Sequence, residues 1–242
     1  MKQAESLAEE GLFEEAIAHT KKAIAIYPHE PKCCIQLAKF YHAQNKMGPA
    51  IEAIKAAVGL DPNNSMNQEH LLKALLQLER YDEVIKHARE MLLTFPRSLL
   101  ARDALGTAYL QTGKLDCALG VVEELIALAP REASHYFKKG VLLQQKGKIR
   151  EAMRSFMMSL ELDPGGELAN NAREAIASLD SFQLKRILGI ASEDVVFRVK
   201  LMRNPASATM ERGFALSPQG IAALRQLDYS WLPTENGTNS YH

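Results

Sequence analysis

The chain has 242 residues, 47% of them hydrophobic and 24% charged, a composition typical of globular rather than disordered proteins. Its 29 Lys and Arg residues balance 29 Asp and Glu residues, so attraction to nucleic acid or to a membrane surface is not expected. No apolar run is long enough to predict insertion into a membrane, and three cysteines without metal-ligand spacing predict reduced thiols in a cytoplasmic protein.

Prolines divide the first two thirds of the chain into units of equal length. Two further series keep the same interval of 34 residues, one mostly of alanine and one of residues predicted to end a helix. Such agreement among different residue types indicates an internal repeat. The three series are Pro28, Pro62, Pro96, Pro130 and Pro164; Ala16, Ala50, Val84, Ala118 and Ala152; and Gly11, Asn45, Glu79, Gly113 and Gly147.

Each unit predicts two antiparallel helices. In residues 99–130, apolar residues recur at helical spacing on both sides of Gly113, which interrupts the run. Because Gly106 and Ala118 lack bulky side chains, we expect the two helices to approach each other closely there. The pattern predicts five repeats within residues 1–164, over 1–30, 31–64, 65–98, 99–132 and 133–166.

This pattern resembles the tetratricopeptide repeat. The match is strongest at Leu105, Gly106, Tyr109, Ala118 and Pro130. The resemblance implies an all-α fold, a right-handed α-solenoid of helix-turn-helix units that binds protein partners. Residues 65–96 depart from the pattern, with Leu72 and Val84 where small residues are usual, so we expect those two helices to be spaced more widely.

Two regions follow the repeats and end in a tail. Gly165 and Gly166 break the repeat pattern, and residues 167–180 predict an amphipathic helix that caps the last repeat. Residues 181–229 predict a small helical C-terminal module, and residues 230–242 predict a flexible tail.

The C-terminal module has lost the 34-residue interval but keeps helix signals. We expect Ser192 and Asn204 to cap two helices, and Ser217 with Pro218 to begin a third. Part of the module resembles small helical leader-type modules related to nitrogen-fixation sequences. The alternative is a helical appendage that packs on the last repeats.

No residue pattern predicts chemistry. The seven histidines are not paired at helical spacing, and the chain has no phosphate-binding loop and no dinucleotide fingerprint. Cys117 directly precedes a predicted core alanine, which favours a structural thiol over a nucleophile. We therefore predict no catalytic residue, no metal site and no cofactor, and a protein that is not an enzyme.

A solenoid of this kind has a concave side lined by the first helix of each repeat. The resemblance implies which side chains face inward, and we predict that they form a groove for a peptide or a helix. The positions are Lys32, Ile35, Lys39, His42, Met66, Glu69, Lys73, Leu76, Leu100, Asp103, Thr107, Leu110, Phe137, Val141 and Gln144.

Some members of the family hold the C-terminal carboxylate of a partner with Lys, Asn and Arg side chains. At the matching positions of this chain only Lys39 is basic and no Asn or Arg occurs, and a frame shifted by one repeat, which contains Lys73 and Lys138, fits no better. That binding mode is therefore not predicted.

Three functions are compatible with the pattern. The first is an interaction scaffold or adaptor for a protein or peptide. The second is a self-assembling homo-oligomer in which the C-terminal module of one chain fills the groove of another. The third is a regulatory subunit or a fragment of an enzyme.

Overall fold

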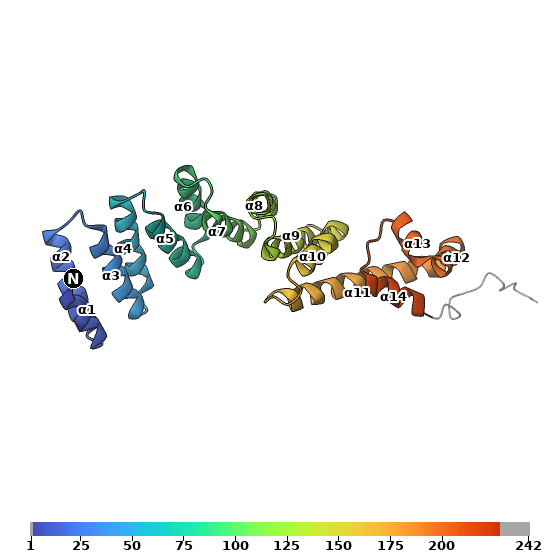
Figure 1. Ribbon diagram of the computed structural model, residues 1–242, viewed down its shortest axis with the longest axis horizontal. Helices are drawn as coiled ribbons and strands as arrows, with labels where there is room; N and C mark the ends of the chain where they lie inside the picture. Colours follow the sequence, from blue (N-terminus) through green and yellow to red (C-terminus); the bar gives the residue numbers. More distant parts are fainter. Residues whose placement is uncertain (1, 228–242) are drawn as a thin grey trace, which may run out of the picture. The chain divides into compact units, whose positions relative to one another are not determined.

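The structure, a computed structural model, describes residues 2–227, and the predicted tail over residues 230–242 lies outside this range. Every regular element in the described range is an α-helix (Figure 1). The chain divides into two compact units, unit 1 over Met1–Leu128 and unit 2 over Ala129–His242. The predicted all-α repeat fold is therefore confirmed, whereas the division falls inside the predicted array of repeats.

Unit 1 contains eight helices among its described residues. Helices α3, α5 and α7 begin 34 residues apart, as do α2, α4, α6 and α8, so the interval found in the sequence sets the helix boundaries. The bounds are α1 Lys2–Glu9, α2 Phe13–Ile26, α3 Pro31–Ala43, α4 Met47–Leu60, α5 Ser65–Gln77, α6 Tyr81–Thr94, α7 Leu99–Gln111 and α8 Leu115–Leu128.

Unit 2 begins with the fifth repeat and ends with four further helices in its described part. Helices α9 and α10 keep the 34-residue interval, and α11 is the long helix against which α10, α12 and α14 pack. This packing explains why the fifth repeat belongs to the same compact unit as the C-terminal helices. The bounds are α9 Ala133–Gln145, α10 Ile149–Leu162, α11 Ala169–Glu193, α12 Val195–Arg203, α13 Pro205–Glu211 and α14 Pro218–Gln226.

The turns inside the repeats all use the left-handed backbone conformation. The five residues predicted to end the first helix have positive φ, at 80° for Gly11, 57° for Asn45, 55° for Glu79, 72° for Gly113 and 71° for Gly147. Glycine adopts this conformation without steric cost, and asparagine tolerates it better than other residues do. Glu79 is therefore the strained member of the series.

Small residues let the helices of a repeat meet. Ala118 and its repeat equivalents are at most 2% exposed. The tightest approach is at Gly140 in unit 2, where an added Cβ would lie 2.6 Å from the buried ring of Phe156. At Gly106, the equivalent position in unit 1, an added Cβ would meet Val121 at 3.5 Å, which is ordinary contact. Close packing therefore requires glycine at residue 140, whereas residue 106, where the sequence predicted the close approach, has room for a methyl group.

The divergent repeat differs as the sequence suggests. Leu72 and Val84 are both buried, and α5 and α6 make fewer close backbone contacts than α3 with α4, α7 with α8, or α9 with α10. Larger side chains between α5 and α6 account for this difference, because they hold the two backbones apart.

The predicted cap of the repeats is longer than expected. Its buried face includes Ala172, Ile176 and Leu179, as predicted, but α11 continues through the expected boundary at residue 180 to Glu193. The second half of α11 carries the core of the C-terminal module. That core consists of Ile187, Ala191, Phe197, Leu201, Ala208 and Leu224.

The caps of the C-terminal helices match two of three expectations. Asn204 accepts a hydrogen bond from the backbone of Ser207, and Ser217 caps α14 by accepting from Gly220. Ser192, however, lies inside the last turn of α11, and the cap of α12 is Asp194, which accepts from the amide of Phe197 at 2.8 Å. Asp194 takes this role because a carboxylate binds the free amides of a helix start well.

Candidate functional site

None of the fifteen predicted groove residues is buried. Twelve lie in unit 1 and three, on α9, lie in unit 2. Lys32, Lys39, His42, Met66, Lys73 and Gln144 are exposed, and the other nine are half-buried. Each of these side chains therefore retains surface that a partner bound to the same unit could contact.

Phe137 has a structural contact as well as an exposed part. Its ring lies 5.5 Å from the ring of Phe156 at an angle of 60°. Tilted aromatic pairs at this centroid distance stabilise the packing of the two helices. Replacing Phe137 would therefore change both packing in α9 and α10 and any binding there.

A cavity of about 340 Å³ in unit 1 brings four of the predicted residues together: Ile35, Lys39, His42 and Lys73. We call it the basic pocket, and it lies among α3, α4 and α5. His70 also lines the pocket, one helical turn before Lys73 on α5, although the repeat pattern did not predict it for the groove. The complete lining is Ile35, Ala38, Lys39, His42, Ala43, Met47, Ala50, Ile54, His70, Lys73, Ala74 and Gln77.

The charge of the basic pocket is not neutralised from within the described chain. No acidic residue lines it, and neither Lys39 nor Lys73 makes an ion pair within residues 2–227. Neighbouring lysines differ: Lys46 pairs with Glu14 at 2.7 Å, and Lys55 pairs with Glu83 at 2.9 Å. The hydrogen bond to Glu83 raises the pKa of Lys55.

The remaining groove residues of unit 1 are not gathered in the basic pocket. Glu69 lines a separate cavity of about 480 Å³ together with Ser65, Met91 and the turn over residues 94–98. Glu69 thus does not line the basic pocket, although it lies one helical turn before Lys73 on α5. Leu76 and Leu110 occupy equivalent positions of α5 and α7 and are both half-buried.

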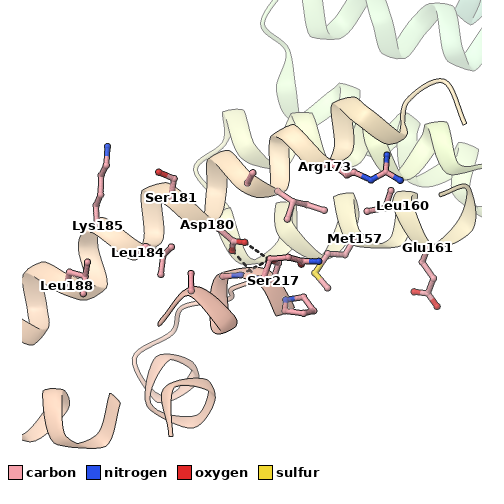
Figure 2. A pocket seen from close by; sticks show the side chains of 16 residues that line it. Met157, Leu160, Glu161, Arg173, Asp180, Ser181, Leu184, Lys185, Leu188 and Ser217 are labelled. Atoms are coloured by element: carbon pink, nitrogen blue, oxygen red, sulfur yellow. Dashed lines mark hydrogen bonds between the residues drawn. The ribbon is translucent and has the colours of Figure 1, made fainter. Parts of the chain in front are cut away.

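Unit 2 contains a larger cavity, of about 770 Å³, lined by α10, α11 and the start of α14 (Figure 2). We call it the α11 cavity. Its apolar lining includes Met157, Leu160, Leu184 and Leu188, and Glu161 lies at one end of the view. This cavity was not predicted from the sequence, although Leu184 and Leu188 continue the helical spacing of the predicted cap.

A buried carboxylate fixes one wall of the α11 cavity. Asp180 is 6% exposed and accepts hydrogen bonds from the backbone amide of Ser217, at 2.9 Å, and from its hydroxyl group (Figure 2). A Cβ added at Gly220 would lie 2.7 Å from the same carboxylate. The start of α14 is therefore held against α11 by Asp180.

A buried amide on the next turn of α11 reinforces this contact. The side chain of Gln183 accepts from the backbone amide of Ala215 at 2.9 Å and donates to its carbonyl at 2.8 Å. The buried polar groups of Gln183 and Asp180 are therefore hydrogen-bonded, and their role is to hold the segment before α14 on α11.

Residues 2–227 contain no group of three or more His, Cys, Asp or Glu side chains that could hold a metal ion. No helix in the same range has the length and apolar character required to cross a membrane. None of the three cysteines forms a disulfide, and burial raises the pKa of the Cys34 thiol.

Part of the chain is similar to much longer enzymes. Over 177 residues it is 27% identical to aspartyl/asparaginyl β-hydroxylase of Homo sapiens, covering 67% of this chain and 23% of the human protein. The Mus musculus hydroxylase gives the same identity, with 24% of its length covered. The chain thus spans about a quarter of the length of these relatives.

Solved structures share the fold. MamA (residues 41 to the end) from Desulfovibrio magneticus RS-1 superposes with a TM-score of 0.57 at 19% identity, covering 69% of this chain and 94% of MamA. YrrB, described as a tetratricopeptide repeat protein with an unusual peptide-binding site, gives a TM-score of 0.58 at 19% identity, covering 71% of this chain and 88% of YrrB.

Family models identify the repeats directly. Two tetratricopeptide repeat models match residues 7–73 and 104–167, which together make up more than half of the chain. The interval of the helices, the buried alanines and the turns with positive φ agree with these matches. The chain therefore belongs to the tetratricopeptide repeat family.

Proposed function

We propose that the chain is a non-enzymatic scaffold or adaptor that binds a peptide or a helix of a partner protein along α3, α5 and α7 of unit 1. The observation that carries the proposal is the set of half-buried apolar side chains on these helices. Ile35, Leu76, Leu100 and Leu110 are all half-buried. They retain accessible apolar surface that a partner could cover.

The energetics favour a rigid binding surface. Covering apolar surface contributes about 25 cal/mol per Å², and binding energy concentrates in a few large side chains. Because the helices are packed before the partner arrives, little ordering cost arises on this side of the interface. The peptide-binding site named for YrrB supports a peptide as the ligand of the same fold.

A peptide selection tests the proposal. Phage display against the intact chain should yield peptides whose affinity falls at least tenfold in the double variant Leu76→Asp and Leu110→Asp, because two charges enter the proposed surface. Leu93→Asp is the control, since Leu93 on α6 is 86% exposed and lies outside the proposed surface. Equal loss in the control and in the double variant would overturn the proposed site.

Self-assembly is the second candidate, favoured by exposed apolar side chains on the C-terminal module. Val196, Val199 and Met202 on α12 and Met210 on α13 are 59–71% exposed. A second copy could cover them, with the module of one chain in the groove of the other. Light scattering at several concentrations would show masses at multiples of 26.9 kDa if this function is correct.

The third candidate is a non-catalytic part of an enzyme, favoured by the similarity to the two hydroxylases. In that case the repeats would hold a peptide for a catalytic domain elsewhere. Mass spectrometry of bound peptides would then detect hydroxylated Asp or Asn when the catalytic partner is present. Detection of unmodified peptides alone would favour the scaffold function over a role as part of an enzyme.

A further inference from the structure

The basic pocket has two lysines at equivalent places of successive repeats. Lys39 on α3 and Lys73 on α5 are 34 residues apart, and the next residues in this series are Thr107 and Val141. The positive charge at this repeat position is therefore confined to the second and third repeats. Because the chain as a whole has zero net charge, these two lysines form a local positive site.

The two lysines are available to a ligand. Both are exposed, and neither makes an ion pair or a hydrogen bond with the described part of the chain. His42 and His70 line the same cavity. The charged side chains that line the pocket, Lys39 and Lys73, are thus both cationic, which favours an anionic ligand.

The floor of the pocket is apolar. Ala38, Ala50 and Ile54 are buried, and Ile35 and Met47 are half-buried beside them. A volume of about 340 Å³ lies at the small end of ligand pockets, which range from about 300 to 1,000 Å³. The pocket fits one or two side chains better than a large cofactor.

The lining limits the kind of anion. Two lysines and no arginine line the pocket, so the anion meets two separate ammonium groups and no guanidinium group. Nucleic acid requires an extended basic surface, whereas Glu69, one helical turn before Lys73 on α5, interrupts the positive charge. A ligand with a carboxylate next to an apolar group complements both the two lysines and the apolar floor of the pocket.

We propose that the basic pocket recognises an acidic side chain within the partner peptide, with an adjacent apolar side chain of the same peptide covering the pocket floor. Lys39 and Lys73 bind the carboxylate, and Ile35 and Ile54 contact the apolar neighbour. The proposal rests on the proposed function, because it names the chemistry of the peptide at one place of the binding surface. It adds that the peptide carries Asp or Glu next to a residue such as Leu.

The test uses a matched pair of probes. Acetyl-Leu-Glu-Leu-amide and acetyl-Leu-Gln-Leu-amide differ by one charge at nearly equal size, and amide NMR of the intact chain reports both affinity and location. We expect the Glu probe to bind at least fivefold more tightly and to shift resonances of α3 and α5. Sodium hexanoate, a small apolar carboxylate, should shift the same resonances at least fivefold more weakly than the Glu probe.

Variants assign the preference to the two lysines. In Lys39→Met with Lys73→Met the preference for the Glu probe should disappear, while the Gln probe binds as before. The control, Lys22→Met with Lys86→Met, makes the same change in net charge at two exposed lysines on α2 and α6, outside the pocket, and should keep the preference. Unchanged thermal unfolding verifies that both double variants fold.

The outcomes separate this proposal from the proposed function. Equal binding of the two probes at α3 and α5 would overturn the acidic preference and leave the peptide surface intact. Absence of shifts at α3 and α5 with either probe would overturn the basic pocket as a site, whereas the phage selection tests the wider surface independently. Hexanoate shifts as large as those of the Glu probe would assign the pocket to a small carboxylate instead.

Discussion

In the repeats, helices meet through alanine and glycine at a fixed interval, whereas α14 is held on α11 by a buried carboxylate and a buried amide. Ala118 and its equivalents are almost fully buried. Asp180 and Gln183 bind the backbone at Ser217 and Ala215, which are 37 and 32 residues away. Apolar contacts between small residues tolerate gradual change, but buried polar groups lose much stability when one partner is removed.

This difference predicts where single substitutions act most strongly. The same apolar contact recurs in every repeat, so each one contributes only part of the stability of the repeat in which it lies. The contacts of Asp180 and Gln183 join segments outside the repeats, so no neighbouring repeat supplies a second copy of them.

Asp180→Ala should produce the largest loss. It leaves the amide and the hydroxyl group of Ser217 without their carboxylate partner, which costs about 2–4 kcal/mol for buried hydrogen bonds to a charged group. Hydrogen exchange should quicken over α14 before it changes in α9 and α10. The control is Glu174→Ala, an exposed acid on the same helix, and similar exchange in both variants would refute the role given to Asp180.

Gly140→Ala and Gly106→Ala compare one repeat position in the two units. A methyl group at residue 140 would collide with the buried ring of Phe156, and such overpacking costs about 1–3 kcal/mol. At residue 106 the methyl group has room, and alanine favours a helix over glycine by about 1 kcal/mol. Denaturant unfolding should therefore show opposite signs, and equal destabilisation would contradict the difference in spacing.

Glu79→Gly should stabilise unit 1 modestly. Glu79 has a φ of 55°, a conformation that costs a residue with a Cβ about 1 kcal/mol more than glycine. Thermal unfolding should occur at a higher temperature in this variant. Gly113→Ala, at the equivalent turn, should lower it, and a rise in both variants would show that backbone strain is not the cause.

The smallest effect is the pH dependence of the start of α12. The hydrogen bond from the amide of Phe197, and then Arg212, lowers the pKa of Asp194 below its ordinary value of 3.8. Because the folded pKa is the lower one, this stabilisation is present above the ordinary value and is lost as the pH falls through the folded pKa. The amide resonance of Phe197 should titrate with a midpoint below 3.8, and a midpoint at or above it would remove Asp194 as the cap.

Much of the repeat fold could be predicted from the sequence because it recurs. The 34-residue interval fixed the helix boundaries, the turns at Gly113 and Gly147, and the buried Ala118. Repetition provides several observations of each position, so an atypical residue such as Glu79 is identified by its place in the series. The same logic placed Lys39 and Lys73 on the same face of successive repeats.

The C-terminal helices could be predicted only in part. The expected cap ended at residue 180 because the interval was lost there, although no proline occurs between residues 167 and 193 to end a helix. The hydrogen bonds of Asp180 and Gln183 join residues far apart in the chain. Such pairs leave no periodic signal and could not be found from a single sequence, whereas Leu184 and Leu188 of the α11 cavity do continue the helical spacing of the predicted cap.

The central claim is that a partner peptide binds to the first helices of the repeats in unit 1. Methyl NMR of the intact chain, with and without a peptide selected by phage display, tests it most directly. We predict that the methyl resonances of Ile35, Leu76 and Leu110 shift while that of Leu93 on α6 does not. Shifts at Leu93 and in α12, with none at Ile35, Leu76 and Leu110, would contradict the claim.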